Sequence, residues 1–153
     1  MKEKTKELLL DLTGVKDASE TVQTWLQEAG AKRRDIIRLR MAVEELATDL
    51  CRHGEGQLRA EFRFFRRFGR DHLRIRYGGE KYDPTAPSGG EMEEFTARIL
   101  AQTGITPTWR WRDGQNELLF RMAGKRHPQL EMPGCVVLAV AVDLLDRDRL
   151  RTE

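Results

Sequence analysis

The stretch that decides the fold is residues 33–77, "RRDIIRLRMAVEELATDLCRHGEGQLRAEFRFFRRFGRDHLRIRY", because its hydrophobic period changes part-way along. Between residues 33 and 52, apolar side chains recur every three or four positions, as in an amphipathic helix. From residue 58 onward they alternate with charged side chains, which is typical of strands with one buried face. A turn near Gly69-Arg70-Asp71 interrupts the alternation, which then resumes as far as Tyr77. The stretch therefore predicts a long helix followed by two antiparallel strands.

Shorter elements flank this stretch on both sides. Residues 7–14 read as a strand ended by Gly14, and Asp17 or Ser19 can cap a helix that stops at Gly30. After a loop rich in Gly and Pro, residues 91–104 predict a third helix, and residues 107–124 predict a hairpin that turns at Asp113-Gly114. This order predicts an α+β protein: a two-layer α/β sandwich, with helices on one face of a mixed, mostly antiparallel sheet.

Length and composition limit the classes of protein. The 153 residues predict one domain, residues 1–125, and a C-terminal extension, residues 126–153, that forms a helix packed on the domain or an interface. A net charge of +2 is too small to favour nucleic acid as a partner. The longest apolar run, "CVVLAVAV", falls far short of the roughly 20 residues that cross a bilayer. With no signal-peptide pattern at the N-terminus, we expect a cytoplasmic protein without membrane contacts.

Glu45, Asp49 and His53 follow one another at four-residue spacing late in the long helix, so they share one stripe of its surface. Two carboxylates on such a stripe could hold a hard divalent cation, and a glutamate could act as a general base. The alternative is a solvent-exposed helix face that contains acidic residues. The spacing alone leaves both interpretations open.

The sequence around these residues resembles a known family. "VEELATDLCRHGEG", residues 43–56, looks like the first nucleotide-site motif of the GHKL (histidine-kinase-like, Bergerat-fold) ATPases, in which glutamate, asparagine and histidine are each separated by three residues. The anti-sigma-factor serine kinases are the most similar branch. The resemblance covers approximately residues 5–124 and includes three further segments: "YGGEKYDP", "SGGEMEEFTARIL" and "RDGQNELLFRM".

The resemblance implies the Bergerat fold, Mg-ATP as cofactor, and a serine/threonine protein kinase or slow ATPase activity. It also implies a regulatory protein as partner, either sigma-factor-like or an antagonist, and is compatible with a homodimer. Glu45 would be the catalytic base and Asp49 the magnesium ligand. The nucleotide-binding positions would be Asp49, His53, Tyr77, Gly79, Gly89 and Gly90.

Three positions depart from the family pattern. Asp49 replaces asparagine, and Tyr77 replaces the aspartate that accepts a hydrogen bond from the adenine amino group. Glu91 or Met92 replaces a glycine of the phosphate-binding turn, and acidic residues in the first turn of that helix would repel phosphate. These departures support an alternative function, in which the chain is a catalytically inactive pseudo-ATPase that works through protein–protein contacts.

A set of arginines is predicted on the sheet face that points away from the helices. They could pair with acidic neighbours such as Glu61, or they could form a docking surface for an acidic protein or a second copy of the chain. The set consists of Arg59, Arg63, Arg74, Arg76, Arg110, Arg112 and Arg121.

Overall fold

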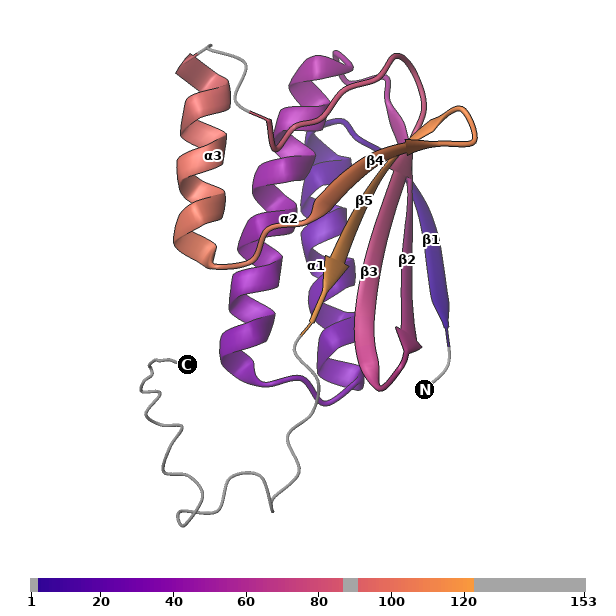
Figure 1. Cartoon of the computed structure of the whole chain (residues 1–153), viewed down its shortest axis with the longest axis vertical. Coiled ribbons are helices and arrows are strands. Elements are labelled where there is room, and N and C mark those ends of the chain that lie inside the picture. Colours follow the sequence, from indigo (N-terminus) through magenta and orange to yellow (C-terminus); the bar gives the residue numbers. More distant parts are fainter. Residues whose placement is uncertain (1–2, 87–90, 123–153) are drawn as a thin grey trace. The chain divides into compact units, whose positions relative to one another are not determined.

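The structure is a computed structural model that describes residues 3–86 and 91–122. The described residues form two layers, with the helices packed against one face of the sheet (Figure 1). The order of elements is the one predicted from the sequence. It runs β1 (Lys4–Leu9), α1 (Leu12–Glu28), α2 (Arg33–His53), β2 (Arg59–Arg67), β3 (Arg70–Tyr77), α3 (Glu91–Thr103), β4 (Thr108–Arg112) and β5 (Gln115–Arg121).

The five strands lie in the order β1-β2-β3-β5-β4, and every pairing between neighbours is antiparallel. The prediction of a mixed sheet was therefore wrong. The crossover through α3 leads from β3 to β4, but the β4–β5 hairpin places β5 between these two strands. Strands joined by a crossover would pair in parallel only if they were neighbours.

The N-terminal strand and helix meet earlier than predicted. β1 ends at Leu9, and the Asp11 carboxylate caps α1 by accepting a hydrogen bond from the Gly14 backbone nitrogen at 2.7 Å. Asp17 and Ser19 consequently lie inside the helix. Gly14 lies in the first helical turn, where a Cβ atom would come within 1.7 Å of the Leu9 carbonyl oxygen. A short acidic side chain two residues after the strand therefore sets this boundary.

The core lies between the sheet and the apolar stripes of α1 and α2, and the predicted alternation of strand residues is confirmed. Only the β2–β3 turn is displaced: it consists of Phe68 and Gly69, both with positive φ, and Arg70 already begins β3. No helix within residues 3–86 and 91–122 is long and apolar enough to cross a membrane. The buried apolar residues of the strands are Leu8, Ala60, Phe62, Phe64, Leu73, Ile75, Tyr77, Leu118 and Phe120.

Two predictions concern residues outside those that the structure describes. They are the phosphate-binding pair Gly89 and Gly90 and the C-terminal extension, residues 126–153. Both stay predictions.

Candidate functional site

The predicted stripe of α2 faces other parts of the fold. Glu45 is half-buried, and its Oε2 atom accepts a hydrogen bond from the Thr96 hydroxyl of α3 at 3.0 Å. One turn later, the side chain of Asp49 is only 3% exposed. His53, at the end of α2, lies against the segment 78–86 that follows β3. The interpretation of these residues as a solvent-exposed acidic face is therefore wrong for Asp49.

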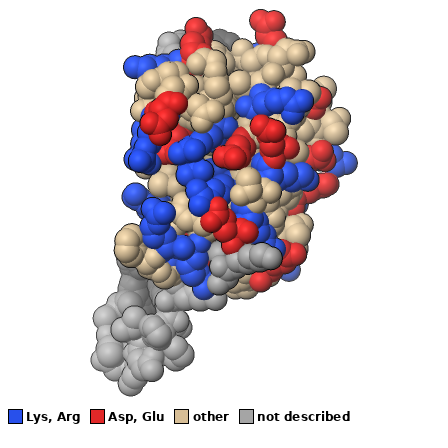
Figure 2. Space-filling view, turned by 90° about the vertical axis from the view of Figure 1, so that its right-hand side faces the viewer, with Lys and Arg blue, Asp and Glu red and all other residues tan. Residues whose placement is uncertain are grey.

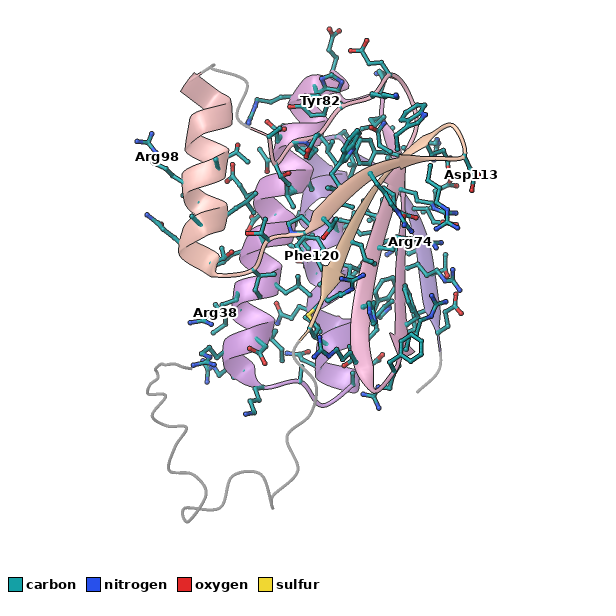
Figure 3. All side chains as sticks on the ribbon, viewed as in Figure 1. Arg38, Arg74, Tyr82, Arg98, Asp113 and Phe120 are labelled. Carbon is teal, nitrogen blue, oxygen red and sulfur yellow. The ribbon has the colours of Figure 1, made fainter. Side chains whose placement is uncertain are left out.

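Tyr82 joins the stripe to the segment after β3. Its hydroxyl donates a hydrogen bond to Oδ2 of Asp49 at 2.6 Å. Its ring stacks on the imidazole of His53, with 3.6 Å between the ring centroids and 8° between the planes. In Figure 3, Tyr82 lies where this segment crosses α2. One aromatic side chain thus occupies the surface between the second and third residues of the motif.

The backbone of Tyr82 is also held in place. Its nitrogen donates to Oδ1 of Asn116 at 2.8 Å, and its carbonyl oxygen accepts from the Tyr77 hydroxyl at 2.6 Å. The Asn116 amide nitrogen donates to the carbonyl oxygen at the end of β3 and to two carbonyl oxygens of the segment that follows, and Trp109 Nε1 donates to Oδ1 of Asn116 at 3.2 Å. We call Asp49, His53, Tyr77, Tyr82 and Asn116 the Tyr82 cluster.

Tyr77 faces the helices, as the strand alternation predicted, and is 1% exposed. Burial raises the pKa of its phenol well above the ordinary value, and the negative charge of Asp83 raises it further. The phenol therefore stays protonated and acts as a hydrogen-bond donor to Tyr82. Donating in this way leaves its only proton committed to the protein's own backbone.

The Asp49 carboxylate has both oxygens engaged. Oδ1 accepts from the Arg52 guanidinium at 3.0 Å, and Oδ2 accepts from Tyr82. A carboxylate offers about four lone-pair sites, and the role of Asp49 as a magnesium ligand stays a prediction. Among the residues that the structure describes, no three His, Cys, Asp or Glu side chains cluster as a metal site would require.

Gly79 has a backbone conformation that favours glycine, with φ of +85°. A Cβ atom added there would meet no heavy atom within 4 Å. The glycine therefore allows the positive φ of the turn after β3, and its role in nucleotide binding stays a prediction.

Sequence reasoning missed Tyr82 and Asn116 as members of the site. Both lie in segments that carried the family resemblance, "YGGEKYDP" and "RDGQNELLFRM". The side chain of an aromatic loop residue such as Tyr82 can point to solvent or into the protein, and the sequence pattern is the same in both cases. Asn116 is the second residue of β5, and only the pairing of β5 with β3 places it beside Tyr77.

The outer face of the sheet carries the predicted arginines (Figure 2). Glu117, 1% exposed, accepts hydrogen bonds from Nε of Arg76 at 3.0 Å and Nε of Arg110 at 2.5 Å, while Arg74 Nε lies 3.8 Å away. Burial alone raises the pKa of Glu117, but the two arginines outweigh it and the net pKa is lowered. Pairing with acidic neighbours is therefore confirmed for these three arginines, and Glu117 is their main partner. Glu61 lies 3.8 Å from Arg74, and Arg63 and Arg112 pair with Glu3 and Asp113.

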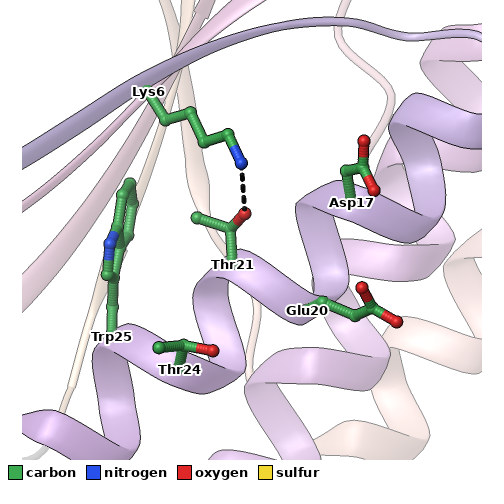
Figure 4. Close-up of a pocket in the computed structure, with 6 residues that line it drawn as sticks. All are labelled: Lys6, Asp17, Glu20, Thr21, Thr24 and Trp25. Carbon is green, nitrogen blue, oxygen red and sulfur yellow. Dashed lines mark hydrogen bonds between the residues drawn. The ribbon is translucent and has the colours of Figure 1, made fainter.

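A separate hollow lies between β1 and α1 (Figure 4). Lys6 Nζ donates to the Thr21 hydroxyl at 3.4 Å, and the carboxylates of Asp17 and Glu20 line the same hollow beside Trp25. The Trp25 ring stacks on Phe64, with 6.2 Å between the centroids. These contacts join α1 to β1 and β2, and none of the lining residues belongs to the Tyr82 cluster.

No family model and no curated protein matches the chain.

Proposed function

We propose that this chain is a regulatory protein-interaction module on a histidine-kinase-like ATPase fold, in which nucleotide chemistry has been replaced by binding to a regulatory protein. The partner would be sigma-factor-like or an antagonist of such a factor. The observation that carries the proposal is Tyr82, which occupies the α2 surface at Asp49 and His53 with its own side chain.

The energy needed to displace Tyr82 supports this proposal. A nucleotide at this surface would have to displace the Tyr82 side chain, which breaks the hydroxyl bond to Asp49 and the stacking on His53. Each hydrogen bond contributes about 1 kcal/mol net, and more where a charged group is left unpaired. A nucleotide would recover only part of this energy, because Asp49 would also repel its phosphates unless a metal offset the charge.

The surroundings of Glu45 point the same way. A general base for phosphoryl transfer must reach the nucleophile's proton within hydrogen-bond distance. Here Oε2 of Glu45 accepts from Thr96, and this bond joins α2 to α3. Glu45 therefore has a structural role that requires no substrate, since it links the two helices.

Nucleotide titration tests the proposal. The unmodified protein should show no heat and no thermal stabilisation with ATP and Mg²⁺ at about 1 mM, because a ligand stabilises only the state that binds it. The matched pair Asp49→Ala and Glu44→Ala completes the design, since Glu44 is an exposed carboxylate on the same helix. Binding by the unmodified protein that is lost in Asp49→Ala and kept in Glu44→Ala would overturn the proposal.

A second candidate function is an ATP-binding regulator whose site opens when Tyr82 leaves. The stacking of Tyr82 on His53 supports it, because a flat ring already occupies a place beside a motif carboxylate. Tyr82→Ala would then bind ATP or adenosine where the unmodified protein does not, and Tyr82→Phe would not. Absence of binding by Tyr82→Ala, with the fold intact by circular dichroism, would exclude this candidate.

A further inference from the structure

A second hollow of the described residues lies on the outer face of the sheet. Its volume is about 740 Å³, and its residues come from the adjoining ends of β2 and β3, the turn between them, β5 and the edge strand β4. Since outward side chains alternate with those of the core, this hollow is on the opposite side of the sheet from the Tyr82 cluster. The lining residues are Phe65, Arg67, Phe68, Arg70, His72, Arg110, Arg112, Leu119 and Arg121. We call this hollow the basic groove.

The basic groove is lined by arginines and by no carboxylate. Arg70 and Arg121 are exposed, and neither has an acidic side chain within 4.0 Å among residues 3–86 and 91–122. Arg67 lies over the Phe65 ring, 5.5 Å from its centroid. These three cations contrast with Arg110, which is bound to Glu117. Among the described residues, no carboxylate therefore compensates the charge at the turn end of the groove.

His72 responds to this charge. Burial lowers the pKa of its imidazole below the ordinary value, and the positive charges of Arg121, Arg67 and Arg70 lower it further, against the opposing hydrogen bond with the Arg70 carbonyl. The imidazole is therefore neutral near pH 7 and adds no charge of its own. An anion bound in the groove would offset part of the arginine charge and so favour protonation of the His72 imidazole.

Phe68 gives the groove an apolar contact point. It is 93% exposed, and its φ of +55° lies in the left-handed region that bulky side chains rarely adopt. Asparagine at this position would fit the two-residue turn with Gly69 better, so a phenylalanine here disfavours the turn and exposes apolar area. Half-buried Leu119 lines the same groove. An aromatic residue with two such costs is more readily explained by a ligand than by the fold.

We propose that the basic groove binds an extended acidic segment of a partner protein, whose carboxylates pair with Arg67, Arg70 and Arg121 while an apolar side chain contacts Phe68 and Leu119. Guanidinium groups match carboxylates through paired hydrogen bonds, and arginine and aromatic side chains dominate the binding energy of protein interfaces.

Single-stranded nucleic acid fits the groove less well. Proteins that bind it without sequence preference stack successive bases on open aromatic rings along a basic track. The Phe65 ring is already covered: it stacks on His72 with 5.1 Å between the centroids, and Arg63 and Arg67 also lie over it. Phe68 is then the aromatic ring of the groove that stays open, and one ring gives no track. Carboxylates, by contrast, need only the guanidinium groups.

This inference extends the proposed function by giving the chemistry of the protein partner. It does not depend on whether the Asp49 surface binds nucleotide, because the two sites lie on opposite faces of the sheet. The nucleotide titration tests one face and the peptide titration below tests the other. Each titration can therefore contradict one proposal without bearing on the other.

The test is fluorescence anisotropy with a labelled synthetic peptide of about twelve residues in which glutamate and leucine alternate, at about 50 mM and about 200 mM NaCl. A peptide with glutamine in place of glutamate and an oligothymidylate of the same length are titrated in parallel. We expect the acidic peptide to bind, with affinity that falls at the higher salt. The glutamine peptide should bind about tenfold more weakly or not at all.

Charge reversal locates the binding. The double variant R70E/R121E should lower the affinity for the acidic peptide by at least about tenfold. The matched control R34E/R98E changes the net charge equally but lies on exposed helix positions, and it should bind as the unmodified protein does. Equal loss in both double variants would mean that only net charge matters, and would overturn the proposed groove.

A second variant separates binding from folding. Phe68→Asn should raise the melting temperature, because asparagine accepts the left-handed turn, and should weaken the acidic peptide severalfold. Unchanged affinity in Phe68→Asn would remove Phe68 from the site. No binding of the acidic peptide at about 1 mM, or tighter binding of the oligothymidylate at the higher salt, would overturn the acidic-segment proposal.

Discussion

The Tyr82 cluster and the basic groove lie on opposite faces of the same sheet and differ in how their polar groups are satisfied. In the cluster, Asp49, Tyr77 and Asn116 find their partners within the chain. In the groove, Arg70 and Arg121 find no carboxylate partner among the described residues. The polar groups on the face that carries the predicted ligand site pair within the protein, whereas the basic groove carries arginines without a carboxylate partner among the described residues. Substitutions on the two faces should therefore affect different properties.

The largest effect is expected from Asn116→Ala. Asn116 is fully buried. Its Oδ1 atom accepts hydrogen bonds from a backbone nitrogen and from Trp109 Nε1, and its Nδ2 atom donates to three backbone carbonyl oxygens. Removing it leaves several buried polar groups without partners, so we expect the free energy of unfolding to fall by about 3 kcal/mol. Urea denaturation measures this change. Gln115→Ala, exposed at the neighbouring position, is the control and should change it by less than about 0.5 kcal/mol.

Glu117→Gln should have the next largest effect, on the paired part of the outer face. The substitution leaves Arg74, Arg76 and Arg110 without their shared carboxylate. We expect a loss of about 2 kcal/mol, less than for a fully buried pair because the Arg110 side chain is half-exposed.

The pH dependence of stability gives an independent check on Glu117. Because its folded-state pKa lies below the unfolded value of 4.5, the carboxylate stabilises the fold above that pH, and the contribution is lost as pH falls through the folded-state pKa. Glu117→Gln should therefore lose less stability on acidification than the unmodified protein. If the free energy of unfolding fell equally with pH in both proteins, the assigned role of Glu117 would be contradicted.

Tyr82→Phe should have a smaller effect, of about 1 kcal/mol. It keeps the ring on His53 and the backbone bonds but removes the hydroxyl donor to Asp49. Thermal denaturation of Tyr82→Phe beside Tyr82→Ala separates the hydroxyl from the ring. If Tyr82→Phe were as stable as the unmodified protein, the bond to Asp49 would contribute nothing, and the two faces would differ less than the structure indicates.

The smallest stability effect should come from R70E/R121E. Both side chains are exposed and without a carboxylate partner among the described residues, so the free energy of unfolding should change by less than about 0.5 kcal/mol. Measured beside Asn116→Ala, this variant completes the contrast: the cluster stabilises the fold, and the groove is available for binding. A large loss of stability would show that the arginines serve the fold as well.

Most of the fold could be predicted from hydrophobic periodicity. The helix from residue 33, the alternation in β2 and β3, and the Asp113-Gly114 turn depend on neighbours close in the chain, so the sequence alone reveals them. The start of α1 was misplaced because a cap depends on one hydrogen bond, and three acidic or hydroxyl side chains could each have made it. The mixed sheet was predicted wrongly because periodicity does not say which strand of a hairpin lies next to β3.

The sequence by itself determined the elements, their order, and the placement of Glu45, Asp49 and His53 on one helix stripe, because helix geometry places every fourth residue on the same side. Only the tertiary structure decided what meets that stripe. Tyr82 and Asn116 are 34 residues apart, and they come together because β5 pairs with β3 and returns the hairpin to the segment after Tyr77. Local spacing fixes which side chains share a face, whereas contacts between distant segments depend on how the strands are ordered in the sheet.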